Sequence, residues 1–434
     1  YNLAPLLQPT WYVDEIALQA LRTRLSQARK TVIYLGESCG EAIGSILEFA
    51  LMTQATLVAA PQAKGLISSY HPRFAGIFGF AGHASARQAL LDPEVDVILA
   101  VGAGLDEYNT NGWDPVLLNS RLIHIDEDPT NFARSPMAAL HVYGRLLTVF
   151  QALIHHSPPA DALLLETESL RQVERRREER RHGDVLPPGA AFVPRLVVDR
   201  RDERRASTES SSSLPARRFT LDSEEKYVDN STPIKPQRLM YDLARLCPPD
   251  TRFFADSGNA VLWAIHSLHP LDRRVGGRRD VRLGTVGTAL GLAGMGKGIG
   301  NAIGVALGSR QQPMVCITGD GSMLMNGQEI TVAMSQKLTV VFVILNDQAL
   351  GTVKHGQRLG DGESIGHELP AINYADLAKA MGIPGHVIKS PQDIAAISMR
   401  SICKHQGPTL LDIRIDGEET PPLEKLCPDG RGKN

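Results

Sequence analysis

The sequence lacks the features that mark secreted, membrane-spanning or zinc-binding proteins. Its five cysteines form no Cys-x-x-Cys pair and no cluster with metal-ligand spacing, which argues against a zinc site and a disulfide framework. No apolar run approaches the roughly 18–20 residues that a membrane-spanning helix needs, and the first residues are not a signal peptide. The formal net charge of -2 gives no reason to expect a nucleic acid or a membrane as partner. We therefore expect a protein of the reducing cytoplasm.

Two long parts of the chain alternate short apolar runs with amphipathic segments. Residues 13–158 contain runs such as TVIYL and VDVILAV, each followed by Gly, and residues 233–420 repeat the arrangement. Such alternation is typical of parallel α/β sheets, and 434 residues exceed the roughly 100–200 of one domain. The sequence therefore predicts an α/β fold with two parallel-sheet, three-layer domains. Residues 1–12 are expected to be the remnant of an inter-domain linker and residues 421–434 a tail.

Composition changes sharply between the two predicted domains. Residues 159–232 are rich in Arg and then in Ser, with few large apolar side chains at any steady period. We interpret this segment as a long, mobile linker. The alternative is an arginine-rich arm that binds nucleic acid or phosphate. It is disfavoured because Phe192 is the only aromatic side chain between residues 166 and 218 that could stack on a base.

Two apolar strands in the second predicted domain each end in a carboxylate. MVCITGD ends at Asp320 and TVVFVILND ends at Asp347, with a helix expected between them at residues 326–338. A strand, helix, strand crossover makes the two strands parallel, so their carboxyl ends lie on one edge of the sheet. We therefore expect Asp320 and Asp347 to be neighbours, at the edge where α/β sheets bind ligands.

These neighbouring carboxylates predict a magnesium and phosphate site. Two carboxylates repel each other unless a cation lies between them, and Mg²⁺ commonly takes one or two carboxylates together with phosphate oxygens. Gly319 and Gly321 let the backbone come close, and Ser322 with the N–H groups that open the following helix forms an anion site. Either strand end alone would be typical of an ordinary turn. The combination, bridged by one helix, indicates a site.

The stretch GDGSMLMNGQEITVAMSQKLTVVFVILNDQALGTV resembles the diphosphate-binding signature of thiamine diphosphate enzymes. In these enzymes Gly-Asp-Gly is followed, one helix later, by Asn-Asn or Asn-Asp, and the chain looks most like the acetohydroxyacid (acetolactate) synthase group. The resemblance implies that Asp320, Asp347 and the backbone carbonyl of Ala349 ligate Mg²⁺. It also implies that Gly321, Ser322 and Gly351 contact the cofactor. The family more often has Asn at the position of Asp347, and the extra charge should strengthen metal binding while repelling the diphosphate.

The resemblance extends to the segments before this signature. GLAGMGKGIGNAIG is similar to the glycine-rich stretch that bends the cofactor into a V shape over a bulky side chain. This implies cofactor contacts for Gly294 and Met295, although a plain core methionine remains the alternative for Met295. ADSGNAVLW resembles the segment whose Gly-Gln-His contacts the diphosphate, which places Gly258, Asn259 and Ala260 there. The glycines fit neither a Walker A pattern nor a strict GxGxxG, which disfavours a nicotinamide site.

Departures from the family pattern concern the substrate side. Ala260 offers only its backbone, and Gly356 stands where synthases usually carry the tryptophan that shapes the acceptor pocket. Thr352 and Val353 are still expected to face the substrate. His355 and His367 are candidates to reach it, with a surface position as the favoured interpretation for each.

The first predicted domain resembles the family's central domain, which binds FAD in acetohydroxyacid synthases without using it chemically. Here Glu37 lies in the turn that would face the FAD diphosphate, and Gly104 stands where the family has an arginine. An added carboxylate and a missing cation both disfavour a phosphate ligand. We therefore treat this domain as mainly structural, with FAD as the alternative.

A third family domain does not match any part of the chain. In the family it holds the pyrimidine ring and carries the glutamate that activates the cofactor, and the residues before Thr31 are too few to form it. We expect that this domain was removed, was left out, or belongs to another polypeptide. The catalytic glutamate therefore has no counterpart in the chain.

The resemblance implies a thiamine diphosphate- and Mg²⁺-dependent enzyme that decarboxylates a 2-keto acid and joins the product to an acceptor carbonyl. Another thiamine diphosphate lyase, such as a glyoxylate carboligase or a pyruvate decarboxylase, remains an alternative, as does a catalytically silent cofactor-binding subunit. A nucleotide-binding dehydrogenase is disfavoured. A homodimer or homotetramer is the expected assembly.

Overall fold

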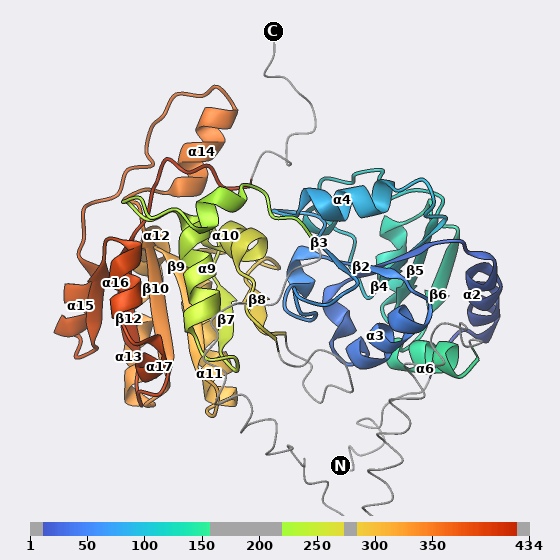
Figure 1. Cartoon of the computed structure of the whole chain (residues 1–434), viewed down its shortest axis with the longest axis horizontal. Coiled ribbons are helices and arrows are strands. Elements are labelled where there is room, and N and C mark those ends of the chain that lie inside the picture. The colour runs from blue at the N-terminus through green and yellow to red at the C-terminus, as the bar shows by residue number, and fades with distance from the viewer. Residues whose placement is uncertain (1–11, 157–218, 273–283, 423–434) are drawn as a thin grey trace, which may run out of the picture. The chain divides into compact units, whose positions relative to one another are not determined.

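The computed structural model describes residues 12–156, 219–272 and 284–422. Within them the chain forms two six-stranded sheets, and every strand pairs in parallel with its neighbours (Figure 1). Helices flank both sheets, so the predicted fold of two parallel α/β domains is confirmed. Most of the predicted linker, residues 157–218, lies outside the described residues, as do residues 1–11 and 423–434 of the predicted terminal segments.

The first sheet has the strand order β3-β2-β1-β4-β5-β6. Its strands are β1 (Thr31–Leu35), β2 (Thr56–Ala59), β3 (Phe74–Ile77), β4 (Val97–Val101), β5 (Leu122–Asp126) and β6 (Leu140–Tyr143). Its α-helices are α2 (Glu15–Gln27), α3 (Ile43–Met52), α4 (Ala84–Leu91), α5 (Glu107–Thr110) and α6 (Leu146–His156). Short 3₁₀ helices are η1 (Glu37–Gly40), η2 (Pro61–Ala63) and η3 (Pro129–Arg134).

The second sheet has the strand order β11-β12-β10-β9-β7-β8. Its strands are β7 (Arg252–Ala255), β8 (Val286–Thr288), β9 (Met314–Gly319), β10 (Val340–Asn346), β11 (Gly385–Ile388) and β12 (Thr409–Arg414). Its longer helices are α9 (Pro236–Leu246), α10 (Asn259–Ser267), α11 (Lys297–Gly308) and α14 (Gly351–Leu359). Shorter ones are η4 (Glu224–Tyr227), α12 (Asp320–Asn326), η5 (Gly327–Glu329), α13 (Ile330–Ser335), α15 (Tyr374–Ala380), α16 (Pro391–Ala396) and α17 (Met399–Ile402).

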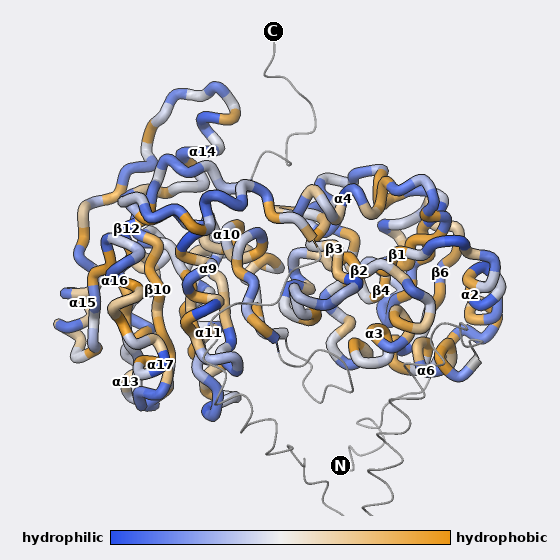
Figure 2. The backbone as a smooth tube through the Cα atoms, in the orientation of Figure 1, coloured by the Kyte–Doolittle hydropathy of each residue, from blue (hydrophilic) through white to orange (hydrophobic). Residues whose placement is uncertain are grey.

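The second sheet separates two hydrophobic layers. All seven residues of β10 are buried, as expected for a parallel strand covered by helices on both faces. Val341, Val343 and Leu345 belong to one core cluster, whereas the alternating Phe342 and Ile344 belong to the other. Figure 2 shows the same pattern, with hydrophobic segments along the strands and hydrophilic segments on the outer helices and loops. Among the described helices, none is long and apolar enough to cross a membrane.

Two details differ from the sequence prediction. The helix expected at residues 326–338 begins at Asp320 instead, directly after β9, and is divided into α12, η5 and α13. The early start follows because Gly319 serves as the N-cap residue in an extended conformation, so the backbone turns into the helix at once. In addition, Phe219, Leu221 and Tyr227 are buried. The packed part of the chain therefore includes the end of the segment that was predicted to be a mobile linker.

The carboxyl ends of β9 and β10 lie next to each other. The two strands pair in parallel from Val340 with Met314 to Leu345 with Gly319, so the loop after β10 reaches the first turn of α12. This edge of the sheet brings together the residues described next.

Candidate functional site

Asp320 connects the ends of strands β9 and β10. Its side chain is 2% exposed, and one carboxylate oxygen accepts the backbone N–H of Gly321 at 2.7 Å. The other oxygen accepts the backbone N–H of Gln348 at 2.8 Å, and Gln348 follows Asp347 directly. The expectation that the two strand ends are neighbours is therefore confirmed.

The two carboxylates at this edge are electrostatically unfavourable as they stand. Burial, and next the negative charge of Asp347, raise the pKa of Asp320 to about 7. Burial likewise raises the pKa of Asp347, although the nearby Lys354 ammonium lowers it in part. Two neighbouring like charges, one buried and one half-buried, favour either a shared proton or a bound cation. The donor set of carboxylate oxygens fits a hard divalent cation such as Mg²⁺.

The remaining ligands for such a cation have to come from elsewhere. Within the described ranges, no three His, Cys, Asp or Glu side chains gather in a way that would hold a metal ion. Mg²⁺ usually keeps several waters and phosphate oxygens besides one or two carboxylates, so a pair of aspartates is consistent with it. The backbone N–H of Ala349 lowers the pKa of both carboxylates, which places this residue beside them. Its role as a carbonyl ligand remains a prediction.

The first turn of α12 contains a buried hydroxyl without a partner. The Oγ of Ser322 is inaccessible to solvent and has no hydrogen-bond partner in the structure. A buried polar atom in this condition is costly unless a ligand or a water satisfies it. No atom lies within 4 Å of the point where a Cβ at Gly319 would stand, so there is open space beside this turn. These two observations fit an anionic ligand that approaches the start of α12.

Met295 reaches the same place from the glycine-rich loop before α11. A Cβ on Gly321 would lie 3.2 Å from the Met295 Cε and 2.7 Å from the Leu350 Cδ2, so a larger residue at position 321 would push these two side chains aside. Met295 is half-buried and belongs to neither hydrophobic core cluster. This favours the predicted role beside the cofactor over the interpretation as a plain core methionine.

Residues from α10 and α14 meet on the other side of Asp347. The Thr352 hydroxyl donates to the Asn259 side-chain oxygen at 3.0 Å. A Cβ on Gly351 would clash with the Asn259 amide and would lie 3.2 Å from an Asp347 carboxylate oxygen. Gly258 adopts a positive φ of 82°, which favours glycine, at the N-cap of α10. The structure thus brings these predicted site residues together.

The other predicted residues lie around this cluster. Ala260 is buried within α10, and Val353 is 43% exposed on α14 beside the exposed Thr352. The carbonyl oxygen of Gly294 accepts the Ser257 hydroxyl at 3.3 Å, which ties the glycine-rich loop to the end of β7. Contacts with a cofactor or a substrate stay predictions for all of them.

One buried carboxylate at this edge was missed by the sequence analysis. Asp256, fully buried after β7, accepts the backbone N–H groups of Gly296 and Gly298, each at 2.9 Å. It also accepts the N–H of Ser257 at 2.9 Å and the hydroxyl of Thr318 at 2.8 Å. Asp256 therefore fixes the loop next to Met295 against strand β9. The only signal in the sequence was an aspartate at a strand end.

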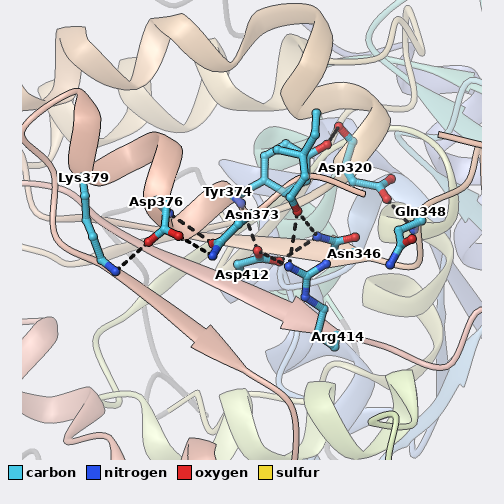
Figure 3. A network of polar contacts seen from close by, with 10 residues as sticks. Asp320, Asn346, Gln348, Asn373, Tyr374, Asp376, Lys379, Asp412 and Arg414 are labelled. Atoms are coloured by element: carbon cyan, nitrogen blue, oxygen red, sulfur yellow. Dashed lines mark hydrogen bonds and ion pairs between the residues drawn. The ribbon is translucent and has the colours of Figure 1, made fainter. Parts of the chain in front are cut away.

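A second polar network lies next to Asp320 (Figure 3). Asp412 on β12 is fully buried and accepts hydrogen bonds from the side chain of Asn346 and the backbone of Tyr374. The Tyr374 hydroxyl in turn donates to the backbone carbonyl of Asp320 at 3.1 Å. The sequence analysis gave no role to these residues, whose partners are far apart along the chain.

The two candidate histidines differ in their surroundings. His355 is buried, so its predicted surface position is wrong. Burial, followed by the charges of Lys354 and Arg358, lowers its pKa, which keeps the ring neutral at pH 7. His367 is half-buried, and its Nε2 lies 2.6 Å from the Ser364 hydroxyl.

The first domain does not provide a good site for the FAD diphosphate. Burial, and then the negative charges of Asp106 and Asp126, raise the pKa of Glu37. The guanidinium of Arg134 donates to the Gly104 carbonyl at 2.7 Å, so a cation does occupy this region although Gly104 itself cannot supply one. The negative charges of Glu37, Asp106 and Asp126 would together repel a diphosphate. These residues do not fit FAD.

Two family models match the chain. The model for the central domain of thiamine pyrophosphate enzymes matches residues 18–153, and the model for their C-terminal TPP binding domain matches residues 277–413. The second match includes Asp320, Asp347 and Gly351, whereas Asp256 and Asn259 lie before its first residue. The chain belongs to the thiamine pyrophosphate enzyme family.

Known relatives within this family point to one group. The acetolactate synthase isozyme 3 large subunit of Escherichia coli is 27% identical over 412 residues, which cover 92% of this chain and 62% of the relative. The acetolactate synthase large subunit of Haemophilus influenzae is 25% identical over 399 residues, which cover 90% of this chain and 60% of the relative. The chain thus spans less than two thirds of the length of these relatives.

Proposed function

We propose that the chain holds the diphosphate and Mg²⁺ end of thiamine diphosphate and takes part in decarboxylating a 2-keto acid and joining the product to an acceptor carbonyl. The observation that carries this proposal is the pair Asp320 and Asp347, a buried and a half-buried carboxylate on adjacent strand ends. The family match supports the cofactor, and the names of the relatives, acetolactate synthases, support the reaction.

The chain's own residues have separate tasks in this proposal. Asp320, Asp347 and the carbonyl of Ala349 would hold Mg²⁺, which would offset the negative charge of the carboxylates and of the diphosphate. The Ser322 hydroxyl and the N–H groups at the start of α12 donate to the phosphate oxygens. The other residues proposed to line the cofactor are Gly258, Asn259, Ala260, Gly294, Met295, Gly321 and Gly351. When bound, thiamine diphosphate supplies a carbon nucleophile and an electron sink for the decarboxylation.

The reaction end of the site needs groups from outside the matched domains. Thr352 and Val353 are exposed at the mouth of the site, where they would meet the substrate. We propose that a pyrimidine-binding domain with an activating glutamate completes the site, supplied by the same polypeptide or by a partner. A homodimer or homotetramer would bring such domains together, and light scattering on the purified protein would measure this assembly.

Product analysis tests the proposed reaction. The protein from the complete gene is incubated with pyruvate, thiamine diphosphate and Mg²⁺, and the products are followed by NMR. We expect carbon dioxide and a branched hydroxy-keto acid, both absent in Asp320→Ala. Free acetaldehyde as the only organic product would instead indicate a simple decarboxylase. Cofactor binding without turnover of any 2-keto acid would indicate a silent subunit.

A further inference from the structure

Asp412 occupies an unfavourable place for a carboxylate. It lies inside strand β12 between the buried Leu411 and Ile413, and its side chain is fully buried. A buried charge is costly unless it is paired and hydrogen-bonded, so an apolar residue would serve this strand better for stability alone. The Arg414 guanidinium pairs with it at 2.9 Å. The cost of burying the Asp412 charge is therefore partly offset, but the strand itself gives no reason to have a carboxylate at this position.

The first contact of Asp412 leads to the end of β10. The Asn346 side-chain amide donates to one Asp412 oxygen at 2.8 Å and to the Ile372 carbonyl at 3.3 Å. Both partners are acceptors, so the orientation of the amide is fixed. Asn346 is the last residue of β10 and directly precedes Asp347. Asp412 thereby holds the backbone from which Asp347 projects.

The second contact leads to the start of α12. The backbone N–H of Tyr374 donates to the other Asp412 oxygen at 3.0 Å, and the Tyr374 hydroxyl donates to the Asp320 carbonyl at 3.1 Å. The side chain of Tyr374 is 1% exposed, so this connection is shielded from water. Figure 3 shows the path from Asp412 through Tyr374 to Asp320.

We propose that Asp412 and Tyr374 are positioning residues that set the distance between the Asp320 and Asp347 carboxylates, and thereby the size of cation that the site accepts. This inference rests on the proposed function. Mg²⁺ demands near-octahedral oxygen ligands at about 2.0–2.1 Å, whereas Ca²⁺ accepts flexible geometry at about 2.3–2.6 Å. Loosening either strand end should therefore weaken Mg²⁺ binding more than Ca²⁺ binding.

Two substitutions each remove one connection. Tyr374→Phe deletes the hydroxyl that holds Asp320 but keeps the ring and the backbone N–H. Asp412→Asn keeps the shape of the side chain but replaces one of its two acceptor oxygens by an NH₂ group. Only one oxygen then remains for the three donors, which are Asn346, the Tyr374 N–H and Arg414. Matched controls are Tyr34→Phe, a fully buried tyrosine whose hydroxyl donates to the Asn109 carbonyl, and Asp242→Asn, a buried aspartate paired with Arg238 on α9.

Calorimetry at saturating thiamine diphosphate measures the apparent Kd of Mg²⁺ and of Ca²⁺ for each variant. The thermal unfolding midpoint of the metal-free protein is measured in parallel. Losing one hydrogen bond should weaken Mg²⁺ binding by about threefold to tenfold in each variant, with a smaller change for Ca²⁺. The controls should leave the Mg²⁺ to Ca²⁺ ratio at the wild-type value. If Asp412→Asn does not fold, Tyr374→Phe decides alone.

Two outcomes would overturn the positioning role. Equal weakening of both cations, or a lowered thermal midpoint with an unchanged ratio, would show that the network only supports the fold. Asp320→Ala separates this failure from failure of the proposed function. If wild-type protein binds no cofactor with Mg²⁺, or if Asp320→Ala binds it as wild type does, the proposed site itself is wrong.

Discussion

Replacing Asp320 by asparagine should stabilise the metal-free protein. The pKa of Asp320 rises from 3.8 to about 7 in the folded state, and one pKa step corresponds to about 1.4 kcal/mol, so ionised Asp320 costs about 4 kcal/mol at pH 8. Asp320→Asn removes this cost but keeps only one side-chain acceptor for the two N–H donors. We therefore expect a net gain of about 2 kcal/mol in the free energy of unfolding at pH 8, after the loss of one charged hydrogen bond.

The stabilising effect of Asp320→Asn should depend on pH. Because the folded pKa is raised, the folded state holds a proton that the unfolded state has lost between pH 4 and 7. The stability contribution of Asp320 in metal-free wild type therefore falls as pH rises through this window, and the contribution is absent in Asp320→Asn. Urea unfolding in EDTA at pH 5 and pH 8 measures the difference between the two proteins.

A second buried aspartate provides the matched control. Asp256 has four hydrogen-bond donors around it, so Asp256→Asn should destabilise the protein by about 1–3 kcal/mol at either pH. At pH 8 we therefore expect Asp320→Asn to raise the free energy of unfolding and Asp256→Asn to lower it. If Asp320→Asn is no more stable than wild type at pH 8 in EDTA, the argument from charge repulsion and burial is refuted.

Three further predictions concern the cofactor. Gly351→Ala should displace the Asn259 amide and weaken thiamine diphosphate binding by about tenfold. Gly356→Ala lies on the same helix, has no atom near its added Cβ, and should bind the cofactor as wild type does. Equal cofactor affinities of the two variants in calorimetry would contradict this prediction. Met295→Ala should lower kcat while the Kd of Mg²⁺ stays near its wild-type value, and a changed Kd with normal kcat would assign Met295 to metal-site support instead. Because of the charge around Glu37, the purified protein should show no flavin absorbance and no FAD binding in calorimetry; a yellow preparation or a measurable FAD affinity would refute this prediction.

The sheet edge could be predicted from the sequence because its cause is local. Two apolar strands joined by one helix have to lie parallel, so their final residues meet at one edge. The contact from Gln348 to Asp320 confirms this step. The helix boundary was predicted less well, because GDGS reads as a turn while the structure continues from Asp320 directly into α12.

The supporting networks could not be predicted, because their members are distant in sequence. Asp256 meets Gly296 and Thr318, and Asp412 meets Asn346 only through the pairing of β12 with β10. The burial of His355 depends on how α14 packs, which the polar composition of that helix does not reveal. Arg134 likewise reaches Gly104 from the end of η3, 30 residues further along the chain.

Calorimetric titration of thiamine diphosphate into the protein, with Mg²⁺ or with EDTA, tests the central claim most directly. Wild type should bind the cofactor with Mg²⁺ and lose nearly all affinity in EDTA. Asp320→Ala should fail to bind under either condition, while remaining folded by circular dichroism. Binding that is independent of Mg²⁺, or that persists unchanged in Asp320→Ala, would contradict the assignment of Asp320 and Asp347 to a metal and diphosphate site.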